Sequence, residues 1–135
     1  MSQQAPKTRT ITLTDRPPVK VREDEWPRIA EGRYEWWDGE YRPQATREVD
    51  LWIRVRRHAD GRAIVYGGYS YESAWQHEEN RRVRVGTMTQ PGDDLASAIE
   101  RVGGELADRI TDAPKAGRLR DVIDECVADL PAEEL

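Results

Sequence analysis

The side-chain types that carry catalysis and metal binding are few in this chain and far apart. Neither His58 nor His77 has a cysteine or a second histidine at the spacing of metal ligands. His58 falls in the turn-like segment HADG, and Cys126 falls on an apolar helical stripe, where a thiol is most simply a small core group. A reaction needs a nucleophile, a base and an electrostatic stabiliser that converge. We therefore expect no enzyme activity, no catalytic residue, no metal site and no cofactor.

Two further patterns, the glycine pairs and the adjacent carboxylates, could indicate a phosphate-binding or catalytic site but have simpler explanations. The pairs Gly67-Gly68 and Gly103-Gly104 lack the GxGxxG spacing and the lysine of a phosphate-binding loop. The adjacent carboxylates Glu78-Glu79 and Asp93-Asp94 fit solubility and helix capping rather than one shared site. These patterns therefore favour a binding function over catalysis.

The composition favours protein binding, because tryptophan, tyrosine and arginine are enriched at interface hot spots. The stretch YEWWDGEYR alternates as a strand, with Tyr34 and Trp36 on one face and Trp37 on the other. We expect Trp36 and Trp52 to pack in the core and Trp37 to point outward. The aromatic residues predicted to contact a protein partner are Trp37, Tyr41 and Trp75.

Charge is divided unevenly along the chain. Residues 1–90 carry 16 basic and 14 acidic groups, whereas residues 91–135 carry 5 basic and 12 acidic groups. An acidic block repels nucleic-acid phosphates and attracts basic protein surfaces. We expect the last helix to meet a protein partner with a basic surface, although these carboxylates could also serve solubility alone. The acidic residues predicted to bind are Asp121, Asp124, Glu125 and Asp129.

A nucleic-acid-binding sheet face is the alternative from another functional class. Strands that interleave arginines with aromatic residues can form stacking platforms for single strands. The net charge of -5 and the general preference for arginine over lysine weigh against direct nucleic-acid binding, so we keep it as the weaker hypothesis. The residues of this alternative face are Trp52, Arg54, Arg56, Arg82 and Arg84.

Hydrophobic periodicity predicts the strands that must position these residues. Residues 1–7 are polar and predict a disordered tail, and residues 8–135 are expected to form a single domain. The acidic residues 23–25 are typical of the first turn of a helix and predict a short helix near residues 23–29. Period-two alternation predicts strands at residues 8–14, 33–37, 50–57, 62–69 and 82–87, with a short edge strand at 19–21.

Turn chemistry predicts how consecutive strands connect. The pair Asp38-Gly39 predicts a two-residue hairpin turn that sets Trp37 against Glu40. The segment HADG at residues 58–61 predicts a second hairpin turn. Gly67-Gly68 indicates either a bulge or a close backbone approach.

Two amphipathic helices are expected to close the chain. Apolar residues recur at helical spacing from Leu95 to Ile110, after a cap at Asp93 or Asp94, and again from Leu119 to Leu130. Gly103-Gly104 interrupts the first helix at a cost of about 1 kcal/mol per glycine, which indicates a kink or tight packing. The order of elements predicts an α+β fold, an antiparallel sheet of four to six strands with both helices on one face.

The cellular setting follows from what the chain lacks. One cysteine cannot form an intramolecular disulfide, and no apolar run approaches the length of a membrane span. We therefore expect a cytoplasmic location and no membrane partner. Arginine-rich strands beside an acidic helix are equally compatible with a homodimer.

Two stretches, LTDRPPVKVREDEWPRIAEG at residues 13–32 and RHADGRAIVYGGYSYESAW at residues 57–75, resemble segments of small proteins of proteobacterial mobile genetic elements. That set includes phage anti-CRISPR proteins of similar size and acidity. The resemblance carries no catalytic motif and no functional residue. It implies a stoichiometric inhibitor of a bacterial defence complex, with a type I CRISPR surveillance complex as the target, acting through acidic side chains that fill a basic nucleic-acid groove.

Overall fold

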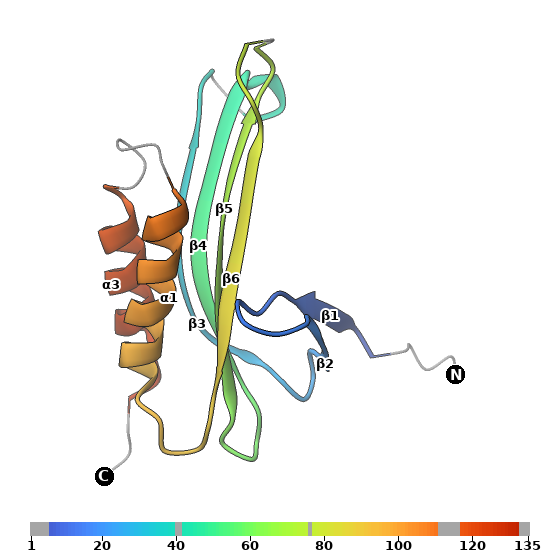
Figure 1. Cartoon of the computed structure of the whole chain (residues 1–135), viewed down its shortest axis with the longest axis vertical. Helices are drawn as coiled ribbons and strands as arrows, with labels where there is room; N and C mark the ends of the chain where they lie inside the picture. The colour runs from blue at the N-terminus through green and yellow to red at the C-terminus, as the bar shows by residue number, and fades with distance from the viewer. Residues whose placement is uncertain (1–5, 40–41, 76, 111–116, 133–135) are drawn as a thin grey trace.

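The fold is an antiparallel sheet with helices on one face and a small hairpin on the other. The computed structural model describes residues 6–39, 42–75, 77–110 and 117–132. Figure 1 shows the two helices lying along one face of the long sheet and the hairpin crossing the opposite face. The elements are β1 (Thr8–Ile11), β2 (Val19–Arg22), β3 (Arg28–Trp37), η1 (Arg42–Gln44), β4 (Arg47–Arg57), β5 (Ala63–Ser73), β6 (Arg81–Thr89), α1 (Leu95–Arg109) and α3 (Leu119–Asp129).

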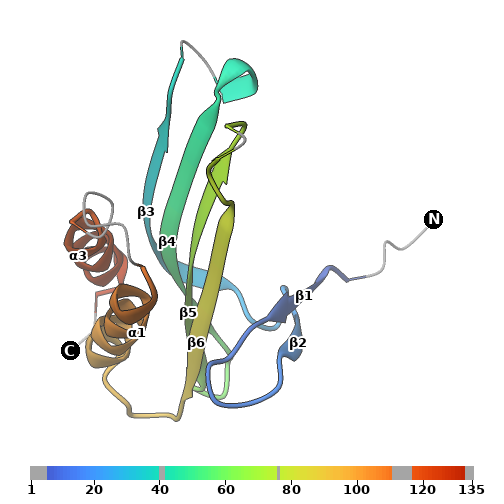
Figure 2. The same ribbon diagram turned by 45° about the horizontal axis from the view of Figure 1, so that its top comes forward.

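The predicted α+β class is confirmed. The strands β3, β4, β5 and β6 form a four-stranded antiparallel meander, and β1 pairs with β2 in a separate antiparallel sheet. Figure 2 shows the hairpin of β1 and β2 on the side of the sheet away from α1 and α3. None of the helices in the described ranges has both the length and the apolarity needed to cross a membrane.

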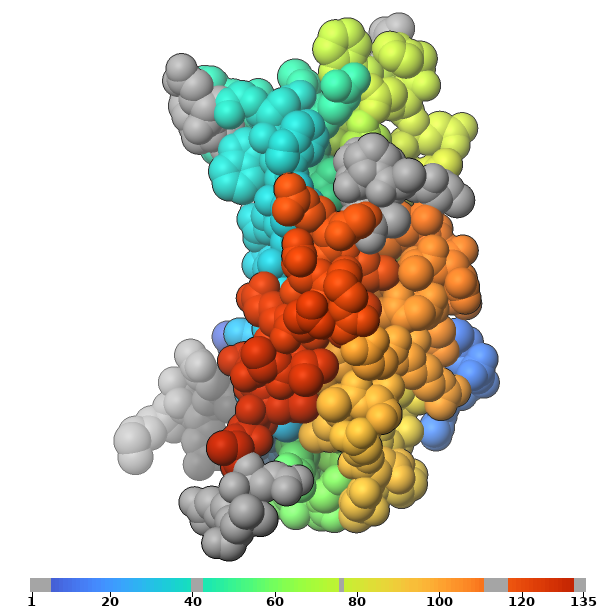
Figure 3. Space-filling view, turned by 90° about the vertical axis from the view of Figure 1, so that its left-hand side faces the viewer, coloured from blue at the N-terminus to red at the C-terminus, as the bar shows by residue number. Residues whose placement is uncertain are grey.

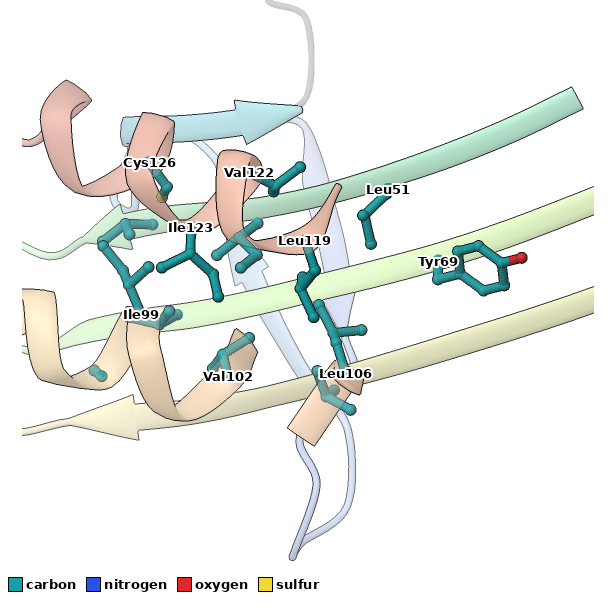
Figure 4. Close-up of a cluster of buried hydrophobic side chains, with 14 of the residues drawn as sticks. Leu51, Tyr69, Ile99, Val102, Leu106, Leu119, Val122, Ile123 and Cys126 are labelled. Carbon is teal, nitrogen blue, oxygen red and sulfur yellow. The ribbon is translucent and has the colours of Figure 1, made fainter. Parts of the chain in front are cut away.

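The main core forms where the helical stripes meet alternate residues of the central strands. Leu51, Ile53 and Val55 of β4 point toward the helices and are fully buried. They face the stripe of α1 that includes Leu106 and the stripe of α3 that includes Val122, as Figure 4 shows for Leu51 and both helical residues. The period of two on the strands and the helical period of 3.6 therefore converge on one apolar layer.

Two glycines let α3 pack closely against its neighbours. A Cβ on Gly32 of β3 would overlap the carbonyl oxygen of Val122 and lie 2.9 Å from the backbone nitrogen of Cys126. A Cβ on Gly103 of α1 would overlap the side chain of Ile123. The tight packing predicted for this glycine pair is thus confirmed at Gly103, whereas a Cβ on Gly104 would meet open space.

A second core covers part of the sheet face that lies away from the helices, here called the open face. Ile11, Val21 and Trp26, from the hairpin and the turn that follows it, pack on Trp52 and Tyr66 of the long sheet. The backbone nitrogen of Thr14 donates to the carbonyl oxygen of Gly86 (2.9 Å) and so fastens this segment to the free edge of β6. The expected strand at residues 8–14 is therefore shorter, because its second half leaves β2 for that edge.

The predicted Asp-Gly hairpin is wrong, although the strand before it is present. Trp37 pairs with Glu48 of β4 rather than with Glu40. Asp38 closes a longer connection, because its carboxylate accepts hydrogen bonds from the backbone nitrogens of Thr46 (2.6 Å) and Arg47 (3.0 Å). These side-chain bonds stabilise the longer loop in place of a two-residue turn.

Three other local predictions have mixed outcomes. The helix expected at residues 23–29 is a turn, and β3 already begins at Arg28. The turn at residues 58–61 is confirmed, with Gly61 at a φ of 96° and the nitrogen of His58 donating to Arg62. The register of β4 with β5 runs without a bulge past Gly67-Gly68, so the close approach is the correct explanation of this pair.

Candidate binding surfaces

The strands are longer than the helices that cover them. At 1.5 Å per residue, α1 with 15 residues is about 22 Å long and α3 with 11 residues is about 16 Å long. At 3.3 Å per residue, β4 and β5 with 11 residues each are about 36 Å long. Figures 1 and 3 show one end of the sheet rising beyond both helices.

This uncovered end carries the exposed tryptophans and is here called the tryptophan end, defined by Trp36, Trp37 and Trp75. They are the exposed large hydrophobic residues of the described ranges, with exposed fractions of 39%, 37% and 49%. Trp36 lies on the helix-facing side of β3 and Trp37 on the open face. The outward position of Trp37 agrees with the prediction, whereas the predicted packing of Trp36 in the core is wrong. Trp36 lies on the edge strand β3 and is exposed, although its partner on β4, Val49, is buried in the main core.

The surroundings of Trp75 hold it in place. The guanidinium of Arg47 lies 5.3 Å from the centroid of the Trp75 ring and donates to the Glu78 carboxylate (2.5 Å). The hydroxyl of Tyr71 also donates to Glu78. These hydrogen bonds, from Tyr71 first and Arg47 second, lower the pKa of Glu78, so its charge persists into mildly acidic solution. Tyr41, the third predicted aromatic anchor, lies outside the described residues.

The acidic face of α3 is partly neutralised by its own arginines. Arg120 donates to Asp124 (2.6 Å) and to Glu100 of α1 (2.5 Å), and its hydrogen bond lowers the pKa of Glu100. Asp121 lies 3.7 Å from Arg118 at an exposed position. Electrostatic attraction of a partner would therefore rely on fewer free charges than the sequence suggests.

The two remaining acidic residues of the predicted set have different surroundings. The carboxylate of Asp129 accepts a hydrogen bond from the backbone nitrogen of Glu31 (2.9 Å), which ties α3 to the edge of β3. Glu125 is exposed and has no ion-pair partner among the residues that the structure describes. Asp129 thus has a structural role, and Glu125 is the freest carboxylate of the face.

The structure brings together four of the five residues of the alternative nucleic-acid face. Trp52 and Arg54 of β4 lie beside Arg82 and Arg84 of β6 in one groove on the open face. Arg56 is separate, because it is 7% exposed and its guanidinium donates to the Tyr66 hydroxyl (2.8 Å) and to the carbonyl oxygen of Trp26 (3.0 Å). Arg56 therefore supports the second core.

His58 and Cys126, whose residue types often act in catalysis, both make contacts that stabilise the fold. His58 accepts a hydrogen bond at Nδ1 from the backbone nitrogen of Asp60 (3.0 Å), and its ring centroid lies 5.0 Å from that of Trp26. Burial raises the pKa of the Cys126 thiol to about 12, so the thiol stays protonated and unreactive. Within the described ranges, no group of three or more histidine, cysteine or acidic side chains could hold a metal ion.

Two features of these surfaces escaped the sequence analysis. The first is the exposure of Trp36, because the predicted strands of at most eight residues, about 26 Å, are hardly longer than the helix predicted over residues 95–110, about 24 Å. The second is Arg9 of β1, which lines the same groove on the open face as Trp52, Arg54, Arg82 and Arg84. No local pattern places Arg9 there, because only the tertiary fold brings β1 next to β4 and β6.

Comparisons with known proteins add no relative. No family model, no curated protein and no solved structure matches this chain. The resemblance to mobile-element proteins therefore stays a prediction.

Proposed function

We propose that this chain is a protein-binding module whose partner docks on the tryptophan end. One observation carries this proposal: three of the five tryptophans are exposed, and all three lie at the end of the sheet that the helices leave uncovered. A buried aromatic side chain contributes roughly 150 to 250 Å² of contact area. A partner that covered these three rings would thus bury a large apolar area contributed by only a few side chains.

The tryptophan end is supported well enough to bind without large rearrangement. The guanidinium of Arg47 lies against the Trp75 ring and is itself fixed by the ion pair with Glu78, and Trp36 and Trp37 belong to a paired strand. A surface whose side chains are already ordered loses less entropy on association. This support favours a stable interface over a transient encounter.

The helix that begins beside the tryptophan end carries exposed carboxylates along its length, with Glu125 lying near Arg28 and Glu31 at the other end of β3, and these favour a basic partner. The guanidinium of Arg118 lies 5.5 Å from the ring centroid of Tyr34, so the start of α3 borders the uncovered part of β3. Asp121 and Glu125 are exposed on the same helix. Carboxylates at the rim of an interface speed association with a positively charged surface more than they add affinity.

The resemblance supplies the class of partner, a bacterial defence complex with a basic nucleic-acid groove. We therefore propose a stoichiometric inhibitor, with a type I CRISPR surveillance complex as its target. Plaque formation by a targeted phage, with and without this protein expressed in proteobacterial hosts, tests that partner class. Restored plaques support an inhibitor, and full protection in every type I subtype tested removes this target.

Binding of purified type I surveillance complexes to the immobilised protein tests the docking surface. The combined variant Trp36→Ala, Trp37→Ala and Trp75→Ala is expected to bind at least about 30-fold more weakly, as for hot-spot residues. Trp37→Ala alone is expected to leave the thermal midpoint nearly unchanged. Arg101→Ala, exposed on the outer side of α1, is the control and should bind like the parent protein. Equal binding by the tryptophan variant would refute the proposed surface.

A further inference from the structure

The open face contains a groove that the tryptophan end does not use. Its volume is about 520 Å³, within the range of small-ligand sites. It lies between the hairpin and the long sheet, and β1, β4, β5 and β6 all contribute to its walls. The polar residues that decide its chemistry are Arg9, Thr10, Thr12, Asp50, Arg54, Arg82 and Arg84. We call this site the arginine groove.

Positive charge in the arginine groove exceeds what the surrounding carboxylates neutralise. Arg9 is paired with Glu23 (2.9 Å), and Arg54 is paired with Glu31 (2.5 Å). Asp50, the one carboxylate that lines the groove among the described residues, is paired with Arg33 (3.1 Å) outside it. Two arginines of β6, at positions 82 and 84, have no carboxylate within ion-pair distance in the part of the chain that the structure describes.

Arg84 is held with most of its guanidinium donors unused. Its Nη1 donates to the carbonyl oxygen of Val83 (2.8 Å) and, more weakly, to that of Tyr69 (3.4 Å). Its other nitrogens have no acceptor among the described residues. A Cβ on Gly68 would lie 2.6 Å from Nη1 of Arg84 and 2.7 Å from the Trp52 ring, so the glycine makes room for both groups.

The cations of the groove repel one another. Burial first and the charge of Arg82 second lower the pKa of Arg84; Asp50 acts in the opposite direction, and Arg54 lowers the pKa by the smallest effect. Arg54 and Arg84 both stack on Trp52, with guanidinium-to-centroid distances of 4.3 and 5.3 Å. Like charges that gather in a partly buried site favour a bound anion, because the anion offsets both repulsion and desolvation.

We propose that the arginine groove binds the phosphate group of a phosphorylated ligand through Arg82 and Arg84. Guanidinium groups present several donors in a planar fork that matches phosphate oxygens. The rings at the groove floor are covered, since Trp52 is 8% exposed and Tyr66 is 4% exposed. Nucleobases therefore find no free aromatic surface on which to stack, and recognition acts on the charge and oxygens of phosphate.

Such a phosphate has two sources, a small ligand or the backbone of a single-stranded nucleic acid. Binding of pyrophosphate followed by calorimetry tests the first, and fluorescence polarisation of a labelled 15-nucleotide single strand at 50 and 200 mM salt tests the second. Movement of the Arg82 and Arg84 Nε–Hε signals in NMR spectra locates either ligand. Tighter binding of the single strand, with strong salt dependence, identifies the nucleic-acid backbone, and binding of pyrophosphate alone identifies a small ligand.

Matched variants separate this site from general electrostatic attraction. Arg82→Gln and Arg84→Gln are each expected to weaken binding at least tenfold, and each should reduce the salt slope of nucleic-acid binding by about 1. Asp50→Asn is expected to strengthen binding by removing the groove's carboxylate. Arg101→Gln changes the net charge equally on the helix side and should bind like the parent protein.

Three results would overturn the proposal. The first is the absence of any shift of the two arginine signals at millimolar pyrophosphate and micromolar oligonucleotide. The second is equal weakening by Arg84→Gln and Arg101→Gln. The third is a glutamate-rich peptide that occupies the groove while phosphate does not, which would assign it to protein carboxylates. Loss of phosphate binding leaves the tryptophan end untouched, because Arg82 and Arg84 contribute nothing to its three rings.

Discussion

Two regions of the same sheet differ in what covers them. Along the helices, the alternate residues of β4 that face α1 and α3 are fully buried, with Leu51, Ile53 and Val55 all at 0% exposure. At the tryptophan end, Trp36 continues the same helix-facing side of the sheet and is 39% exposed. Its partner Val49, on the neighbouring strand β4, is 1% exposed, so core and surface are separated both by the reach of the helices and by the position of Trp36 on the edge strand β3.

This difference shows that an apolar strand face indicates burial only as far as another element reaches. The protein leaves large aromatic rings beyond the helices, where burial by a partner would stabilise the complex rather than the fold. Exposed tryptophans gathered at one end are unusual for a surface with no binding role. Four changes test this contrast between the covered region and the tryptophan end.

The largest effect is expected from Gly32→Val, which would force α3 away from β3. The added side chain has to displace the backbone of Val122, which cannot move without lifting the helix. We expect a loss of more than about 3 kcal/mol in the free energy of unfolding, measured by urea denaturation. Gly104→Ala, at a helical position facing open space, is the control and should stabilise by about 0.5 to 1 kcal/mol. A mild effect of Gly32→Val would mean that α3 docks loosely.

The next effect compares one truncation in each region. Leu106→Ala removes a fully buried side chain of α1 and is expected to cost about 3 kcal/mol. Trp36→Ala removes a larger side chain and is expected to cost at most about 1.5 kcal/mol, because much of the ring is already in water. Thermal and urea unfolding of both variants give the comparison. Equal costs would show that Trp36 contributes to the core and would weaken the proposed docking surface.

A smaller effect concerns alkaline pH and the covered region. Folding raises the pKa of Cys126 from 9 to about 12, so the thiol's contribution is fully present below pH 9 and is lost as pH rises toward 12. Between pH 9 and 11, unfolding free energy should fall more steeply in the parent protein than in Cys126→Ala, by up to about 1.4 kcal/mol per pH unit. Parallel pH profiles would indicate that water reaches the thiol.

The smallest effect on stability is expected on the acidic face of α3. Asp124→Lys with Glu125→Lys changes exposed groups and should alter unfolding free energy by no more than about 0.5 kcal/mol. Association with a basic partner should nevertheless become slower and less dependent on salt. Stopped-flow association at two salt concentrations measures this change. Unchanged rates would leave these carboxylates with solubility as their role.

Local patterns were sufficient for most of the secondary structure. Alternation in the segment around Ile53 and the stripe that includes Leu106 predicted a strand and a helix that the structure contains. Asp94 caps α1 as the sequence suggested, with its carboxylate accepting from the backbone nitrogen of Ala96 (3.2 Å). These features depend on neighbours within a few residues, which is the range that a sequence pattern reports.

The candidate surfaces were predicted less completely. The sequence assigned Trp37 an outward position and placed Arg54 on the face away from the helices, and both assignments agree with the structure. It also placed Arg56 beside Arg54, but Arg56 is buried under the turn that carries Trp26. That burial could not be inferred, because the turn reaches Arg56 only through the path of the hairpin across the sheet.

By itself, the sequence determined the two periodicities, the order of strands before helices and therefore the face on which each side chain lies. The tertiary structure decided which lengths of those faces are covered, and so made Trp36 a surface residue and Arg56 a buried one. The physical reason is that burial arises between segments far apart in the chain. The reach of α1 and α3 along the strands, and the position of β1 against β4 and β6, are fixed by packing and not by local propensity.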